Sequence, residues 1–149
     1  RMNETLSIVV PAYNEEDAVD DILKRCLDAR AVLMKEAGLS SVEIVIVDDG
    51  SRDKTQEKAR RWTEAKLVVH KKNQGYGAAL MTGFRASSGD LLSFLDADGT
   101  CDPLAFKGLI LAMREAKRIW PWVLGCTKAP KCPPCARLET VFMPCCCAA

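Results

Sequence analysis

Four short apolar runs recur along the first 116 residues, and longer stretches separate them in which apolar side chains return every three or four positions. Short runs that are mainly apolar predict buried strands. These runs are residues 6–10, 42–47, 67–69 and 91–95. The intervening spacing has the period of amphipathic helices, which are therefore expected over about 15–38, 53–65, 75–86 and 103–116.

Local signals indicate where these helices begin. Asn14 is expected to cap the first helix, Asp53 and Gln56 to form a capping box at the second, and Pro103 to begin the fourth. Strands that alternate with helices and are apolar on both faces predict a parallel sheet covered on both sides. The predicted fold is therefore α/β, with three layers and a mainly parallel sheet.

Polar residues gather where three of the predicted strands end. They are the segments 13–15, 48–49 and 96–98. In parallel α/β sheets, ligands bind beyond the carboxyl ends of the strands. The convergence of acids on this edge of the sheet predicts a binding site there.

Asp96 and Asp98 are two positions apart, directly after the fourth apolar run. If the backbone stays extended through them, both carboxylates point to the same side. Two hard oxygen ligands on one side suit Mg²⁺ or Mn²⁺ that bridges a diphosphate. The alternative is that the two acids only form a turn and cap the next helix. Their position after a strand, beside a second acidic strand end, favours the metal.

Asp48 and Asp49 end the second strand, where a carboxylate can accept hydrogen bonds from a nucleobase or from ribose hydroxyls. Tyr13 offers a flat face for a base and Glu15 a carboxylate. Alternatively, Tyr13 and Glu15 only shape the beginning of the first helix.

Gly75 and Gly77 lie at the expected start of the third helix, where backbone N–H groups can reach a phosphate. As part of a G-x-G-x-x-G pattern this pair is incomplete, because Leu80 replaces the third glycine. Ligand contact and tight packing of the helix on the sheet both remain open. His70 is the only histidine, and a surface or core role is favoured over a catalytic one.

Four segments of the chain together resemble the successive motifs of the family-2 glycosyltransferases, in the same order. The branch most similar to this chain is that of the dolichyl-phosphate mannose synthase-like enzymes and bacterial polyprenyl-phosphate glycosyltransferases. The four segments are V-V-P-A-Y-N-E-E at 9–16, I-V-D-D-G-S-R-D-K-T at 46–55, N-Q-G-Y-G-A-A at 73–79 and F-L-D-A-D-G-T at 94–100. Lys54 departs from the family pattern, in which glycine is usual at this position.

The resemblance implies a Rossmann-like GT-A fold that binds a UDP- or GDP-linked sugar with Mg²⁺ or Mn²⁺. It also implies an inverting transfer of the sugar to an acceptor such as a polyprenyl phosphate or a glycan. The residue that would deprotonate an acceptor is not assigned. The metal ligands would be Asp96 and Asp98. The expected nucleotide-sugar-binding residues are Pro11, Tyr13, Glu15, Asp48, Asp49, Asn73, Gly75 and Asp96.

Net charge and the length of the apolar runs indicate which kinds of partner the chain is expected to bind. The chain has 149 residues, a net charge of +1 and 28% charged residues, so no strong positive field predicts binding to nucleic acid. No run reaches the roughly 18 apolar residues that span a bilayer. The expected location is therefore the cytoplasm, either free or peripheral at the inner face of a membrane that holds a polyprenyl-phosphate acceptor.

Three rival functions are weighed against the transferase. The first is a non-catalytic module that only binds a nucleotide sugar. The second is a dinucleotide enzyme, which is disfavoured because the first strand leads into Pro-Ala-Tyr-Asn rather than a glycine-rich turn. The third is a phospho-acceptor receiver domain, which would place paired acids after its first strand.

The predicted domain covers residues 1–116, and residues 117–149 form an irregular tail that is expected to be non-native and to leave the fold incomplete. Six of the eight cysteines fall in the last 24 residues, without helical or strand periodicity. Only Cys132 and Cys135 have C-x-x-C spacing, which disfavours a zinc site. A one-base frameshift near Lys117 explains the tail better, because codon degeneracy permits the shifted frame A-V-G-S-R-M-H-K-G over this stretch.

The frameshift hypothesis predicts that restoring one base near codon 117 gives a chain that folds more completely. A restored strand would cover the edge of the sheet beside the fourth strand, so the repaired chain should be more soluble and more resistant to protease. Limited proteolysis and sedimentation of the two chains, expressed in parallel, measure this. Equal behaviour of the two chains would show that the tail is genuine.

Overall fold

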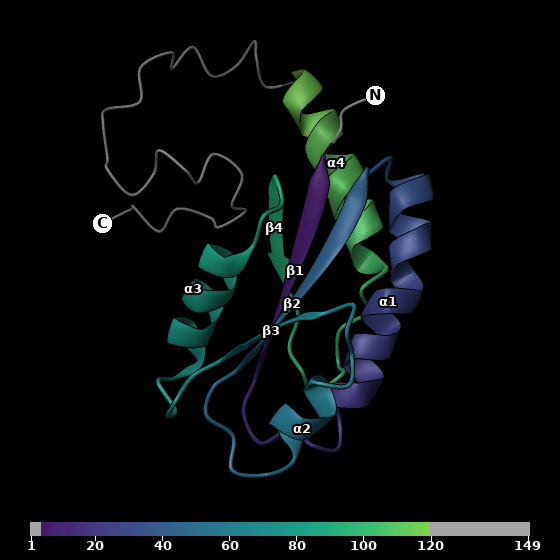
Figure 1. The fold of residues 1–149 in the computed structure, drawn as a ribbon. Helices are drawn as coiled ribbons and strands as arrows, with labels where there is room; N and C mark the ends of the chain where they lie inside the picture. The colour runs from purple at the N-terminus through teal and green to yellow at the C-terminus, as the bar shows by residue number, and fades with distance from the viewer. Residues whose placement is uncertain (1–3, 120–149) are drawn as a thin grey trace, which may run out of the picture.

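The computed structural model describes residues 4–119, in which four strands alternate with four helices (Figure 1). The strands are β1 (Thr5–Ala12), β2 (Ser41–Asp48), β3 (Lys66–Val69) and β4 (Leu91–Phe94). The helices are α1 (Val19–Glu36), α2 (Thr55–Ala59), α3 (Tyr76–Ala86) and α4 (Ala105–Ile119). The predicted order of alternating elements is confirmed.

The four strands form one sheet in the order β3-β2-β1-β4, and all three pairs are parallel. Ala12 of β1 lies level with Asp48 of β2, and Asp48 lies level with Val69 of β3. The predicted parallel sheet is therefore confirmed. Its register brings the carboxyl ends of three neighbouring strands to the same edge.

Helices cover both faces of this sheet. The alternation of side chains along β1 divides the core, because Ile8 and Val10 pack with α1 and α4, whereas Val9 packs with α3. Figure 1 shows α3 on one side of the sheet and α1 and α4 on the other. The three-layer α/β architecture predicted from the apolar runs is confirmed.

The predicted beginning of the first helix is wrong. Residues 16–18 form a turn after Glu15, and α1 begins at Val19 without a side-chain cap. Asn14 has a left-handed backbone with φ 55°, and its side-chain oxygen accepts a hydrogen bond from the backbone N–H of Arg52 at 2.9 Å. The short polar side chain that suggested a cap therefore joins two loops instead.

Other helix boundaries also differ from the prediction. The second helix ends at Ala59 rather than near residue 65, and α4 begins at Ala105, two positions after Pro103. Asp53 does bind the next turn through Thr55, but its second oxygen accepts the backbone N–H of Glu16. It thereby joins α2 to the loop after β1.

Beyond the sheet, α4 continues past the predicted end at residue 116. Most of the predicted tail, residues 120–149, lies outside the described residues, as do the expectations about its cysteines and reading frame. Within residues 4–119, no helix is both long and apolar enough to cross a membrane.

Close packing of α3 on the sheet depends on Gly83. A Cβ at this position would overlap the Cγ1 methyl of Val9 and lie 3.1 Å from Cγ2 of Val47. Gly83→Ala should therefore lower the free energy of unfolding by about 1–3 kcal/mol, the usual cost of overpacking. Urea unfolding followed by circular dichroism measures this.

Gly108 provides a matched control, because it lies in α4 and a Cβ there meets nothing within 4 Å. Gly108→Ala should raise the free energy of unfolding by roughly 0.5–1 kcal/mol through helix propensity alone. If both substitutions shifted the urea midpoint of unfolding in the same direction, the inference that α3 packs closely on the sheet at Gly83 would be wrong.

Candidate functional site

A cavity of about 320 Å³ opens at the carboxyl ends of β1, β2 and β4. Ligand sites in α/β folds commonly have this position and size. Tyr76 and Ala79 of α3 form one wall. Most of the predicted site residues line this cleft, namely Pro11, Tyr13, Glu15, Asp49, Asn73, Asp96 and Asp98. Asp48 and Gly75 are not among its lining residues.

The Asp49 carboxylate forms the base of the cleft on the β2 side and is only 3% exposed. Its Oδ1 lies 2.6 Å from Nδ1 of His70 and accepts the backbone N–H of Gln74 at 2.9 Å. Its Oδ2 accepts the backbone N–H of Gly75 at 2.8 Å. Burial alone would raise the pKa of Asp49, but these hydrogen bonds outweigh it and hold the pKa below its ordinary value.

His70 links the Asp49 carboxylate to α3. Its ring is buried, with Nδ1 against Asp49 and Nε2 2.9 Å from Oγ1 of Thr82. A core or surface role was expected for His70, and its side chain is buried against Asp49, which lines the cleft. Spacing alone could not have revealed this pairing, because the three side chains come from β2, the end of β3 and α3.

Of the paired acids after β2, only Asp49 reaches the cleft. Asp48 is 1% exposed and accepts the backbone N–H of Ser51 at 3.2 Å, which stabilises the turn after the strand. Successive residues at a strand end point in opposite directions, so one of the two had to turn away.

Gly75 supports the cleft from behind. Its N–H is donated to Asp49 and to the Asn73 side chain, at 2.8 and 3.1 Å, so the backbone donor is already used. Its φ of 93° is a conformation that favours glycine, and this explains the residue type. Asn73 itself lines the cleft.

Asp96 and Asp98 lie at the opposite end of the cleft, next to α3. The backbone does not stay extended through them, since β4 ends at Phe94 and residues 97–98 form a turn. Both acids nevertheless line the same cavity. The predicted extended geometry is therefore wrong, although both acids line the cleft.

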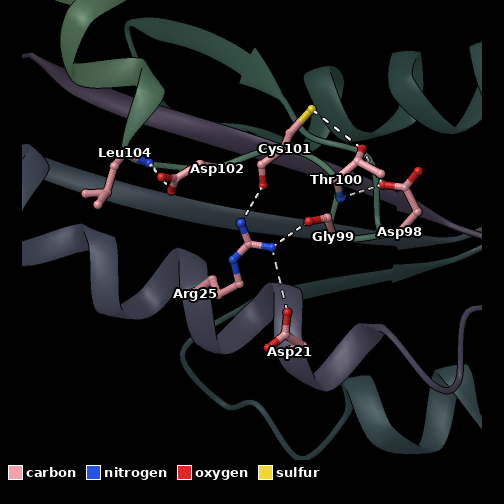
Figure 2. Close-up of polar contacts among 8 residues, drawn as sticks. All are labelled: Asp21, Arg25, Asp98, Gly99, Thr100, Cys101, Asp102 and Leu104. Carbon is pink, nitrogen blue, oxygen red and sulfur yellow. Dashed lines mark hydrogen bonds and ion pairs between the residues drawn. The ribbon is translucent and has the colours of Figure 1, made fainter.

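Each of these carboxylates has one oxygen held by a neighbour. Tyr76 donates its hydroxyl proton to Oδ1 of Asp96 at 2.6 Å, and burial together with this hydrogen bond raises the pKa of Tyr76 to about 12. Thr100 donates its N–H and its hydroxyl proton to Oδ1 of Asp98, at 2.9 and 2.8 Å (Figure 2). These bonds lower the pKa of Asp98. Tyr76 was quoted in the sequence motif, but its contact with Asp96 was not foreseen.

The two carboxylates fit a divalent cation that is completed by other ligands. Within residues 4–119, their Oδ2 atoms accept no hydrogen bond, and no group of three or more His, Cys, Asp or Glu side chains is arranged to hold a metal. Mg²⁺ and Mn²⁺ commonly bind one or two carboxylates and take their remaining ligands from phosphate and water. The donor set therefore fits a metal that binds together with a diphosphate.

Comparisons with known proteins agree with this geometry. The sequence profile described as "Glycosyl transferase family 2" matches residues 7–130. The undecaprenyl-phosphate 4-deoxy-4-formamido-L-arabinose transferase of Edwardsiella ictaluri is 39% identical over 98 residues, which are 62% of this chain and 29% of that protein. The chain thus spans less than a third of this relative's length.

Two solved structures are similar in fold. The mannosyltransferase PcManGT from Pyrobaculum calidifontis, in complex with GDP-Man and Mn²⁺, has a TM-score of 0.54 and 28% identity over 62% of this chain and 27% of that one. Glucosyl-3-phosphoglycerate synthase from Mycobacterium tuberculosis, in complex with Mn²⁺, UDP and phosphoglyceric acid, has a TM-score of 0.56 and 27% identity over 74% and 39%. The predicted GT-A fold is confirmed, and the chain belongs to glycosyl transferase family 2.

Proposed function

We propose that this chain forms the donor-binding part of an inverting glycosyltransferase, which transfers a sugar from a nucleotide diphosphate to an acceptor. The observation that carries the proposal is the cleft itself, which Asp49 lines after β2 and Asp96 and Asp98 line after β4, on either side of β1. A cavity of about 320 Å³ has the size of a small-molecule site.

The nucleoside is assigned to the end of the cleft between β1 and β2. Tyr13 is 40% exposed there, so its ring is accessible to a base, and Pro11 and Glu15 complete the same wall. Asp49 accepts three hydrogen bonds from the protein, which leaves little accepting capacity for a ligand. Its main contribution is to hold the loop that carries Asn73 against the cleft.

The diphosphate is assigned to the end formed by Asp96 and Asp98. The lining residues include four carboxylates and no Lys, Arg or His side chain, so an anionic diphosphate would meet like charge. Mg²⁺ or Mn²⁺ between Asp96, Asp98 and the phosphates removes this repulsion. When bound, such a metal supplies Lewis-acid stabilisation of the departing diphosphate. The Mn²⁺ in the two similar structures supports this assignment.

The acceptor is assigned by class alone. The relative from Edwardsiella ictaluri is named for transfer to undecaprenyl phosphate, which favours a polyprenyl phosphate over a soluble glycan. In an inverting reaction, an acceptor oxygen attacks the anomeric carbon from the face opposite the nucleoside diphosphate, and the bond to the diphosphate breaks. An acceptor of this kind would bring the protein to the inner surface of a membrane.

A second candidate function is binding of the nucleotide sugar without turnover. The donor cleft alone would suffice for it. Release of UDP or GDP from the matching sugar nucleotide in the presence of undecaprenyl phosphate distinguishes the two. Donor binding without release would favour the binding fragment.

Donor binding should depend on a divalent cation. UDP or GDP should bind more tightly with Mn²⁺ or Mg²⁺ than with EDTA, because Asp96 and Asp98 attract the diphosphate only through a metal. Isothermal titration calorimetry measures both affinities. Equal affinity in EDTA would contradict the metal role.

The two ends of the cleft should respond differently to substitution. Asp49→Ala should weaken the binding of free uridine or guanosine. It should also lower the free energy of unfolding by about 1–3 kcal/mol, because His70 and two backbone N–H groups lose their acceptor. Asp98→Ala should weaken only UDP or GDP in the presence of Mn²⁺, since Asp98 is exposed and holds no other segment in place. Calorimetry below the melting temperature of each variant compares them. An equal loss of nucleoside affinity would refute this division.

A further inference from the structure

The segment between β4 and α4 carries both acids of the proposed metal site, yet it has little regular structure of its own. Residues 95–104 contain only turns and bends. Asp96 is held from outside the segment by Tyr76 of α3. Asp98 has no such contact, because its hydrogen-bond donor, Thr100, belongs to the same loop.

Arg25 of α1 binds the middle of this loop, residues 99–101, from outside. Its Nη1 donates to the carbonyl oxygen of Gly99 at 2.6 Å, and its Nη2 donates to that of Cys101 at 2.9 Å (Figure 2). Among the described residues, no other side chain from outside the loop forms a hydrogen bond with residues 97–102. The attachment of residues 97–102 to the rest of the protein through side-chain hydrogen bonds therefore depends on the guanidinium of Arg25.

The two carbonyls lie on either side of Thr100, the residue that orients Asp98. Because Arg25 fixes the backbone at 99 and at 101, it also fixes the N–H of Thr100 between them, and that N–H is donated to Asp98. The planar fork of a guanidinium can reach two acceptors in a fixed geometry, whereas a lysine ammonium offers a single point of attachment.

The surroundings keep the guanidinium in place. Oδ2 of Asp21, one turn earlier on α1, lies 3.7 Å from Nη1 of Arg25 (Figure 2). Gly99 has a φ of 75°, and a Cβ there would lie 3.5 Å from the same nitrogen. The left-handed turn explains the glycine, since a Cβ would meet the arginine only at an ordinary van der Waals distance.

We propose that Arg25 is a positioning residue for the metal and diphosphate end of the cleft. By clamping the carbonyls of Gly99 and Cys101, it holds the loop in the conformation that presents the Asp98 carboxylate to the cleft. This assignment rests on the proposed function, in which Asp98 binds a divalent cation with the diphosphate. Arg25 contacts neither the metal nor the nucleotide and acts only through the loop.

The test compares Arg25→Met and Arg25→Lys with the unchanged chain of 149 residues. In Mn²⁺, the affinity for UDP or GDP should fall about tenfold in Arg25→Met, which loses both charge-assisted hydrogen bonds to the loop, and less in Arg25→Lys. The affinity for uridine or guanosine, and for UDP or GDP in EDTA, should not change. A purely structural role would weaken all of these ligands together.

Amide hydrogen exchange provides a second readout that needs no ligand. Exchange should become faster in the peptide covering residues 96–104 of Arg25→Met and stay unchanged in the peptide covering 9–16. Arg30→Met is the matched control, because Arg30 lies on the same helix and donates to the carbonyl of Glu64, at 3.4 Å, away from the cleft loop. Arg30→Met should leave both readouts for the 96–104 loop unchanged.

The outcomes separate this inference from the proposed function. If the unchanged chain gains no affinity from Mn²⁺, the proposed metal role fails, and loop exchange alone decides whether Arg25 anchors the loop. If exchange at 96–104 is the same with and without the arginine, the inference is wrong even where the metal dependence holds. Should Arg25→Met not fold, Arg25→Lys, which keeps the charge and a helix-forming side chain, gives the same comparison.

Discussion

The parallel direction of all four strands is the constraint on which the rest of the structure depends. It sends every connection out at the same edge of the sheet, and the register keeps the ends of β1, β2 and β3 level, with Ala12 beside Asp48 and Asp48 beside Val69. Hydrogen bonding between strands continues past their ends, since Asp49 N–H binds Ala12 O and Leu95 N–H binds Val9 O. The loops that form the cleft therefore begin from fixed and neighbouring positions.

Hydrogen bonds between the loops then fix the edge of the cleft. The backbone N–H of Asn14 binds Oγ of Ser51 at 3.0 Å, and that of Glu15 binds Oγ1 of Thr55 at 2.8 Å. Asn14 in turn accepts the N–H of Arg52. Asn14, Ser51 and Thr55 of the two motif segments thus join one loop to the other. A substitution in the second segment would accordingly disturb the first.

The sequence predicted the sheet well because a strand buried on both faces leaves a mainly apolar run, as in residues 42–47, where only Glu43 is polar. Predictions of helix caps from neighbouring residues failed where a polar side chain could bind more than one partner. The cap expected at Asn14 uses the same acceptor chemistry as the bond to Arg52, and no local pattern distinguishes them. The anchoring of the cleft by His70 and Arg25 was equally hidden, since each acts across more than twenty positions of sequence, on Asp49 and on Gly99. Such contacts follow from the topology and not from the spacing.

Charge explains why the two ends of the cleft cannot share one role. The Asp49 carboxylate is buried and satisfied by His70 and two backbone N–H groups, so little of its charge is left to act on a ligand. Asp98 is exposed, and only one of its oxygens is bound within the described residues. Two unit charges of like sign about 4 Å apart near a protein surface repel by roughly 4 kcal/mol, more than one or two hydrogen bonds return. Under the proposed function, a diphosphate beside Asp96 and Asp98 would therefore require a cation between them, and the position of Asp98 would decide how well that cation is held.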